Sequence, residues 1–203
     1  MKILKSLFVI IALFLTLAAT HGKENKVEDL SGTAFMVIDI QNDYFKSGRK
    51  TLEGSEEASL KAKKLLDFFR KKGVLVVHVQ HIAKSAKATY FLPDTDGAKI
   101  HKNALPIAGE KIVTKSKVSS FEDTDLGEYL DSKNIKELIL CGMQTNVCLE
   151  KAAMVATEKK YGVKVIEDAA AAVKKETHVE TIDRMKKNGI KVLKTGEIIG
   201  SLK

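Results

Sequence analysis

The chain contains short apolar runs that do not alternate with polar residues, and residues 34–40 (AFMVIDI) are the clearest example. A strand has this composition when both faces of its sheet are covered, as in the centre of a parallel sheet. Between the runs lie segments with apolar residues at helical spacing, such as Ala58, Ala62, Leu65 and Phe69. Strand and helix patterns alternate along the chain. This alternation predicts a three-layer α/β fold, with a six-stranded, mainly parallel sheet and helices on both faces.

The boundaries of these elements follow from the same patterns. The predicted strands are residues 34–40, 74–79, 111–115, 137–142, 163–167 and 190–193. Helical spacing covers residues 58–69 and 126–130, a third helix begins near Thr145, and the pair Thr177 and Glu180 predicts a capping box for a fourth. Residues 82–110 hold both prolines and no regular pattern, so we interpret them as a candidate lid.

The first 22 residues have the composition of a secretory signal peptide. Lys2 and Lys5 precede an uncharged run over residues 7–19, which is shorter than the ~20 residues of a membrane-spanning helix. An uncleaved membrane anchor is the alternative. The prediction is a signal peptide over residues 1–22 and a single domain over residues 23–203. The mature protein is then secreted or periplasmic, without stable membrane association.

The charge of the chain is positive but dispersed. The net charge is +8, and it becomes +6 once Lys2 and Lys5 are removed. Most of the excess is lysine interleaved with glutamate, and there are only three arginines, Arg49, Arg70 and Arg184. This pattern indicates a solvated surface rather than a nucleic-acid groove. The expected partner is a small-molecule substrate.

The chain has two cysteines, Cys141 and Cys148. A disulfide between them is one interpretation in a secreted protein, but one lies at a strand end and the other in a helix start, which fits bridge geometry poorly. Cys141 is best explained as a small core residue. In the first turn of a helix, Cys148 would meet free N–H groups and the positive end of the helix dipole. That environment favours a thiolate nucleophile and can hold an oxyanion.

Three polar residues follow or close predicted strands: Asp39, Lys115 and Cys148. Ligands of an open parallel sheet bind outside the carboxyl ends of its strands, so these side chains are expected to meet at one edge. Alone, each could be a bonded loop carboxylate, a solvated amine or a buried thiol. Together they predict a nucleophilic site: Lys115 lowers the pKa of Cys148, Asp39 exchanges the proton, and the sulfur attacks a carbonyl carbon. The scheme requires no metal and no cofactor.

The three segments resemble motifs of the isochorismatase-like cysteine hydrolases, which include nicotinamidases and N-carbamoyl amidohydrolases. Residues 37–45 (VIDIQNDYF) are similar to the first-strand motif of that family. Thr114 and Lys115, followed by residues 119–121 (SSF), resemble its lysine motif, and residues 142–148 (GMQTNVC) resemble its nucleophile motif. The resemblance runs from about Gly32 to the C-terminus.

The resemblance implies an Asp39, Lys115 and Cys148 triad on a six-stranded parallel sheet. It also implies a cis peptide bond between Met143 and Gln144, and an oxyanion hole formed by the backbone N–H groups of Gln144 and Cys148. The implied assembly is a homo-oligomer.

By the same resemblance, Gln41, Phe45 and Phe121 line the substrate pocket. Structural packing near the sheet edge is the alternative role for Phe45 and Phe121.

The chain departs from the nicotinamidases, which carry an Asp-x-His pair and a further histidine for a metal after the second strand. Here the region has His78 and His81 and no such aspartate. Residues three apart on a strand face opposite sides, so these histidines form a poor chelate. The prediction is a metal-independent hydrolase of small amide, carbamoyl or ureido compounds. Two alternatives remain: a vinyl-ether hydrolase that uses Asp39 and Lys115, and a non-catalytic small-molecule-binding or thiol-redox protein on the same fold.

Overall fold

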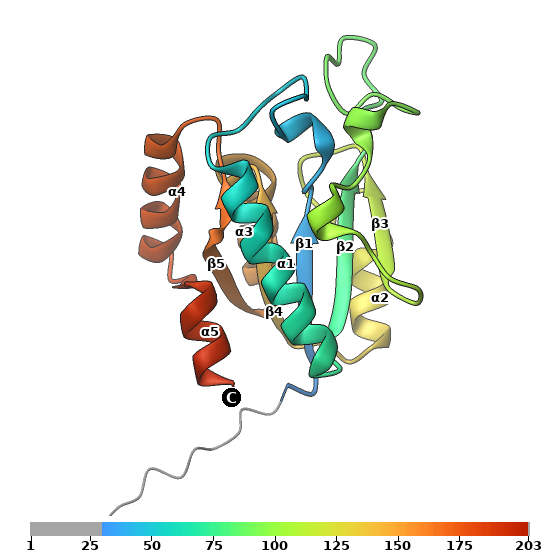
Figure 1. Cartoon of the computed structure of the whole chain (residues 1–203). Coiled ribbons are helices and arrows are strands. Elements are labelled where there is room, and N and C mark those ends of the chain that lie inside the picture. The colour runs from blue at the N-terminus through green and yellow to red at the C-terminus, as the bar shows by residue number, and fades with distance from the viewer. Residues whose placement is uncertain (1–29, 203) are drawn as a thin grey trace, which may run out of the picture.

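The computed structural model describes residues 30–202, which are built around a six-stranded sheet (Figure 1). The strands are β1 (Thr33–Ile38), β2 (Leu75–His81), β3 (Lys111–Lys115), β4 (Glu137–Met143), β5 (Gly162–Ala171) and β6 (Lys191–Leu193). Their order is β3-β2-β1-β4-β5-β6, and every neighbouring pair runs parallel. The predicted α/β fold is therefore confirmed, and the sheet is parallel throughout rather than mainly so.

Helices cover both faces of the sheet. They are α1 (Ser55–Lys71), α2 (Leu126–Ser132), α3 (Glu150–Glu158), α4 (Lys175–Lys187) and α5 (Thr195–Ser201). The buried residues of α1 and α5 join one hydrophobic cluster, and those of α2, α3 and α4 join a second. In Figure 1, α1 crosses in front of the strands and α2 lies behind them. The two clusters account for the absence of alternation in β1, because Phe35 belongs to one and Met36 to the other.

The strand order creates a switch point between β1 and β4. From β1 the chain proceeds to β2 and β3 on one side, and it then returns to place β4 and β5 on the other. Connections leave β1 and β4 in opposite directions, which opens a crevice at their carboxyl ends. Asp39 directly follows β1, and Cys148 lies five residues beyond the last residue of β4. Two of the three predicted site residues therefore flank the switch point.

The C-terminal third differs most from the predicted boundaries. β5 continues to Ala171, with a register shift against β4 between Leu140 and Gly142. The predicted capping box at Thr177 is wrong, because α4 already begins at Lys175. The Glu53 carboxylate accepts a hydrogen bond from the Lys175 N–H at 2.9 Å and so caps the helix from a distant part of the chain. Helix α5 was not predicted.

The segment between β2 and β3 has little regular structure, as expected, and is drawn in green in Figure 1. It contains two 3₁₀ turns, η2 (Asp96–Ala98) and η3 (Lys102–Ala104). Another 3₁₀ turn, η1 (Asn42–Tyr44), supplies an anchor for it: the Asp43 carboxylate accepts a hydrogen bond from the Phe91 N–H at 2.6 Å. Phe91 is buried, so part of this segment belongs to the core.

The predicted signal peptide, residues 1–22, lies outside the described residues. Within residues 30–202, no helix has the length and apolar content that crossing a membrane requires.

Candidate active site

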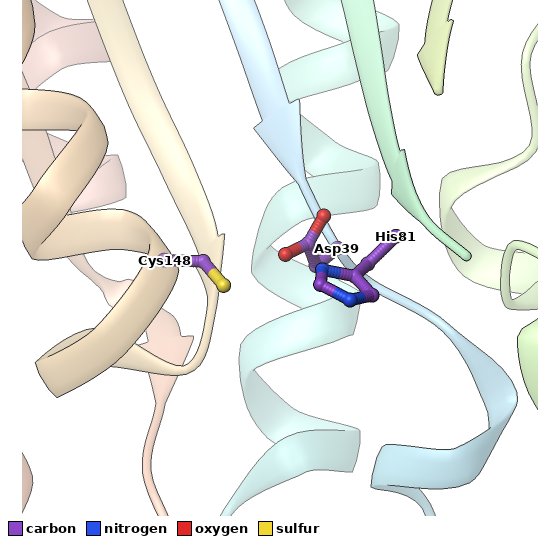
Figure 2. Close-up of side chains that lie close together, drawn as sticks. All are labelled: Asp39, His81 and Cys148. Carbon is purple, nitrogen blue, oxygen red and sulfur yellow. The ribbon is translucent and has the colours of Figure 1, made fainter. Parts of the chain in front are cut away.

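The structure brings Asp39, Lys115 and Cys148 together from three separate parts of the chain. The Lys115 Nζ atom lies 2.8 Å from Asp39 Oδ2 and 3.3 Å from Cys148 Sγ. All three residues are buried, and Cys148 is 4% exposed. Figure 2 shows the Asp39 carboxylate and the Cys148 sulfur pointing toward one another across the switch point. This grouping is the one that the carboxyl-end rule predicts.

Asp39 adopts an unusual backbone conformation. Its φ angle is 51°, in the left-handed region that most residues avoid but aspartate tolerates. The Asp39 N–H still donates to the Val79 carbonyl at 2.9 Å, so the residue remains tied to β2 while its side chain turns into the site. Both carboxylate oxygens are buried without a hydrogen-bond partner among the described residues, and Oδ2 is held by its ion pair with Lys115. One carboxylate oxygen thus binds the ammonium, and the other is free to exchange a proton.

The nucleophile turn depends on a glycine. Gly142 has a φ of +134°, and a Cβ atom on it would lie 2.0 Å from the Ile38 carbonyl oxygen. No other residue fits there, because β1 and β4 approach closely where both strands end. The Met143–Gln144 peptide bond that follows is cis. Cys148 then lies in a π-helical turn, η4 (Thr145–Leu149), which continues directly into α3.

The Lys115 ammonium is surrounded by acceptors. Besides Asp39 and Cys148, it contacts the carbonyls of Lys117 at 3.1 Å and Val118 at 3.3 Å, and His81 Nδ1 at 3.2 Å. Burial opposes the charge, but the neighbouring Asp39 and Cys148 reverse this effect and raise the pKa of Lys115 above its usual range. Lys115 is therefore a fixed cation.

The surroundings of the Cys148 sulfur act on its pKa in opposite directions. Burial raises the pKa of the Cys148 thiol, the negative charge of Asp39 raises it further, and Lys115 only partly opposes these effects. These effects favour the thiol form of Cys148 beside the Asp39–Lys115 ion pair. The predicted lowering by Lys115 is therefore opposed by two effects that act together, burial and the Asp39 carboxylate. A thiol next to a charged carboxylate still has a base to receive its proton.

The two cysteines are both free thiols and lie on opposite faces of the sheet. Cys141 is fully buried in the cluster beneath α1, whereas Cys148 belongs to the cluster beneath α3. The disulfide considered from the sequence does not form in this structure.

The three predicted pocket residues have different contacts in the structure. The Gln41 amide is fully buried, and its hydrogen bonds go to backbone groups of His81 and Ala98 at 2.7–2.8 Å. Phe45 stacks on His101 with ring centroids 3.6 Å apart. Phe121 stacks on Tyr161, which immediately precedes β5 at the amino end of the sheet. Gln41 is therefore a backbone clamp, and Phe121 packs away from the carboxyl-end edge.

His81 belongs to the site, although the sequence analysis considered it only as part of a chelate. In the paired strands β2 and β3, His81 stands opposite Lys115. Asp39, His81 and Cys148 offer ligand atoms within 4.8 Å of one another, which is a spacing that could hold a metal ion. The Lys115 ammonium contacts all three of those groups, however, so the residues present do not fit a metal while Lys115 is in place.

One cavity adjoins this group of residues. It has a volume of about 210 Å³, and His81 forms part of its wall. Its other lining residues are Ala83, Lys84, Ser85, Ala88, Tyr90 and Ser116. The cavity is smaller than the ~300–1,000 Å³ typical of sites for drug-sized ligands.

A buried thiol, carboxylate and ammonium at the switch point of a parallel sheet define a cysteine-hydrolase type of site. Residues 33–197 match the family model described as the isochorismatase domain. The chain belongs to the isochorismatase family and is a hydrolase of that family.

Individual relatives agree with this assignment. The uncharacterized isochorismatase family protein YddQ of Bacillus subtilis is 42% identical over 139 residues, covering 68% of this chain and 77% of YddQ. The ureidoacrylate amidohydrolase RutB of Agrobacterium fabrum is 26% identical over 172 residues, covering 68% of this chain and 75% of RutB. A crystal structure assigned to the isochorismatase hydrolases, from Oleispira antarctica, has a TM-score of 0.79 at 36% identity, covering 84% of this chain and 97% of that one.

Proposed function

We propose that the protein is a secreted hydrolase of C–N bonds in small amide, carbamoyl or ureido compounds, acting through a cysteine thioester. The observation that carries the proposal is the contact of one ammonium with both Asp39 Oδ2 and Cys148 Sγ, at 2.8 and 3.3 Å. Nucleophilic catalysis requires a base near the sulfur and a charge that stabilises the thiolate as it forms. The name of the relative RutB, an amidohydrolase of a ureido compound, supports the choice of bond.

In the first half of the reaction, the Cys148 thiol transfers its proton to Asp39, and the sulfur attacks the carbonyl carbon. Lys115 offsets the negative charge on the sulfur while the proton moves. The N–H groups of Gln144 and Cys148 hold the oxyanion of the tetrahedral intermediate. The C–N bond then breaks, Asp39 returns the proton to the leaving nitrogen, and the acyl group remains on the sulfur.

In the second half, water replaces the amine. Asp39, again a carboxylate, takes a proton from the water as its oxygen attacks the thioester carbonyl. The same N–H groups hold the second oxyanion. Cleavage of the C–S bond releases the acid, and the sulfur recovers a proton from Asp39. Because Asp39 Oδ1 has no other hydrogen-bond partner among the described residues, it is available for both transfers.

The experiment compares Cys148→Ala with Cys141→Ala on a panel of small amides, N-carbamoyl compounds and ureido acids. Loss of hydrolysis in the first variant and retention in the second is the expected result, because Cys141 lies on the other face of the sheet. Intact-mass measurement after rapid quenching should show the acyl group attached to the enzyme without substitutions. If only an added vinyl-ether substrate is cleaved, and Cys148→Ala cleaves it as fast as the unsubstituted enzyme, vinyl-ether chemistry through Asp39 and Lys115 would be favoured instead. Substrate-induced thermal stabilisation without product would favour a binding protein.

Export and assembly are further parts of the proposal. Lys2, Lys5 and the uncharged run over residues 7–19 support cleavage of a signal peptide and release into the periplasm or the medium, without stable membrane association. Intact mass of the exported protein tests this, since retention of residues 1–22 would contradict it. We also propose a homo-oligomer. Leu105 and Ile107 each expose more than half of their surface and could contribute to a contact between copies. Light scattering of the purified protein tests assembly.

A further inference from the structure

His81 and Lys115 form a contact that the proposed reaction does not yet use. They stand opposite each other on β2 and β3, and the Lys115 Nζ atom lies 3.2 Å from His81 Nδ1. Lys115 has only three N–H bonds, while five acceptors lie within 3.3 Å of its nitrogen. The directions of these acceptors determine where the charge sits relative to the sulfur.

We propose that His81 is a positioning residue, whose Nδ1 atom holds the Lys115 ammonium beside the Cys148 sulfur. This inference rests on the proposed function of that site. Asp39 binds the ammonium from the end of β1, and the carbonyls of Lys117 and Val118 bind it from the loop after β3. His81 is the acceptor from the β2 side.

The contact fixes the tautomer of His81. An ammonium group has hydrogens to donate and no lone pair, so the Nδ1 atom that it contacts must be unprotonated. A neutral His81 then carries its proton on Nε2. In Figure 2, one nitrogen of the His81 ring lies next to Asp39 and the other is turned away. Burial and the charge of Lys115 both lower the pKa of His81, and Asp39 only partly opposes them, which agrees with a neutral ring.

The backbone of His81 is itself held in place. Its N–H donates to Gln41 Oε1 and its carbonyl accepts from Gln41 Nε2, both at 2.8 Å. The ring also packs against Phe91, with centroids 5.7 Å apart. A neighbour that is fixed on both sides can orient Lys115 more strongly than a mobile one. Gln41 therefore affects the site indirectly, by fixing the backbone of His81.

The same geometry argues against a direct catalytic role for His81. One of its ring nitrogens is within 4.8 Å of the Cys148 sulfur, but the Lys115 ammonium contacts both the His81 Nδ1 atom and that sulfur. The lone pair of Nδ1 is directed to that ammonium and is not free to accept the thiol proton. His81 therefore acts through Lys115. Its ring also lines the 210 Å³ cavity together with Lys84 and Tyr90, so a test must separate the hydrogen bond from the shape of the side chain.

The test compares His81→Asn with His81→Leu, which have side chains of nearly equal size. The Asn Oδ1 atom can accept from Lys115 at the place of Nδ1, whereas Leu cannot. The readout is the rate constant for alkylation of Cys148 by iodoacetamide at neutral pH, with thermal unfolding as the control for folding. We expect a loss of about tenfold for His81→Leu and of less than about threefold for His81→Asn, because only the latter keeps the bond to a charged donor.

A double-mutant cycle with Lys115→Met tests whether His81 acts through Lys115. In that background, His81→Leu should cause no further loss of alkylation rate. Equal rates for the Asn and Leu variants, or a full effect of His81→Leu in the absence of Lys115, would overturn the inference. Alkylation needs no substrate, so these results stand even if no compound of the amide panel is hydrolysed, an outcome that counts against the proposed function alone.

Discussion

Two ionic clusters contact opposite faces of strand β2, and they differ in how completely their carboxylates are bonded. In the first, Glu110 accepts hydrogen bonds through both oxygens, from Arg70, from the Ile107 N–H and from His78, at 2.8–2.9 Å. In the second, around Lys115, neither Asp39 oxygen has a hydrogen-bond partner among the described residues, and Oδ2 is held by its ion pair with Lys115. The histidines of the two clusters, His78 and His81, are three residues apart on one strand.

The comparison shows which feature identifies a reactive site in this fold. Each cluster contains a carboxylate, a cation and a histidine, so the residue types alone do not distinguish them. The bonds of Glu110 are complete, and they join the segment before β3 to helix α1 and strand β2. Asp39 is incompletely bonded and lies next to a thiol, so its carboxylate can accept a proton from the sulfur during a reaction. We therefore expect changes in the first cluster to affect stability and changes in the second to affect reactivity.

The largest effect should come from Asp39→Asn. Hydrolysis should fall about 10²–10⁴-fold, because the group that exchanges protons with sulfur, amine and water is lost. Alkylation of Cys148 should nevertheless shift to lower pH, since the negative charge of Asp39 raises the pKa of the thiol and the amide has no charge. The measurements are kcat/KM and the pH dependence of iodoacetamide labelling. A shift to higher pH would show that Asp39 does not act on the sulfur in this way.

The opposite pattern is expected for Glu110→Gln. Burial alone would raise the pKa of Glu110, but the bonds from Arg70, the Ile107 N–H and His78 lower it to about 2. A depressed pKa contributes stability above the pKa of the unfolded chain, near 4.5, and this stability is lost as the pH falls toward 2. The variant should lose about 3 kcal/mol of unfolding free energy at pH 7 and show a flatter acid limb.

Urea unfolding at several pH values measures the effect of Glu110→Gln. The control is Asp67→Asn, which removes an exposed helical ion pair with Lys63 and should cost less than ~0.5 kcal/mol. Cys148 alkylation should be unchanged in both variants. If Glu110→Gln altered alkylation as strongly as Asp39→Asn, the two clusters would not be separate.

Most of the fold and the three reactive residues could be predicted from sequence, because both follow from local rules. The third strand, residues 111–115, was predicted to the residue from its short apolar core. The carboxyl ends of parallel strands lie at one edge of the sheet, so the side chains of Asp39, Lys115 and Cys148, which lie at or shortly after strand ends, were expected to meet there. The carboxyl-end rule needs no knowledge of side-chain packing.

The remaining features depend on contacts between distant segments, which no local pattern encodes. The start of α4 is capped by Glu53, 122 residues away from Lys175. The charge state of Cys148 depends on its burial and on its distance from Asp39. His81 was assessed for chelation only. It lies beyond the predicted end of the second strand at residue 79, and its register opposite Lys115 appears only in the paired sheet.

A smaller effect is expected at Gln41, whose amide joins the end of β2 to the turn at Ala98. Gln41→Ala should lower the unfolding free energy by about 2 kcal/mol, because a buried N–H and buried carbonyls lose a partner. Alkylation of Cys148 should fall only modestly, through looser placement of His81. A substrate-binding role for Gln41 predicts a raised KM with unchanged stability, so urea unfolding and steady-state kinetics together decide between the two.

The smallest effect tests how firmly the nucleophile turn is attached to α4. Thr145 is fully buried in that turn, and its hydroxyl lies 2.8 Å from His178 Nδ1. Thr145→Val keeps the shape and removes this bond, at a cost of about 1 kcal/mol, because the partly exposed His178 can bind water instead. The control is Thr157→Val, which removes only a hydroxyl bond to a carbonyl within α3 and should be nearly neutral. Urea unfolding measures both costs. If Thr145→Val but not Thr157→Val changed the rate of Cys148 alkylation, the contact with His178 of α4 would also contribute to the reactivity of the sulfur.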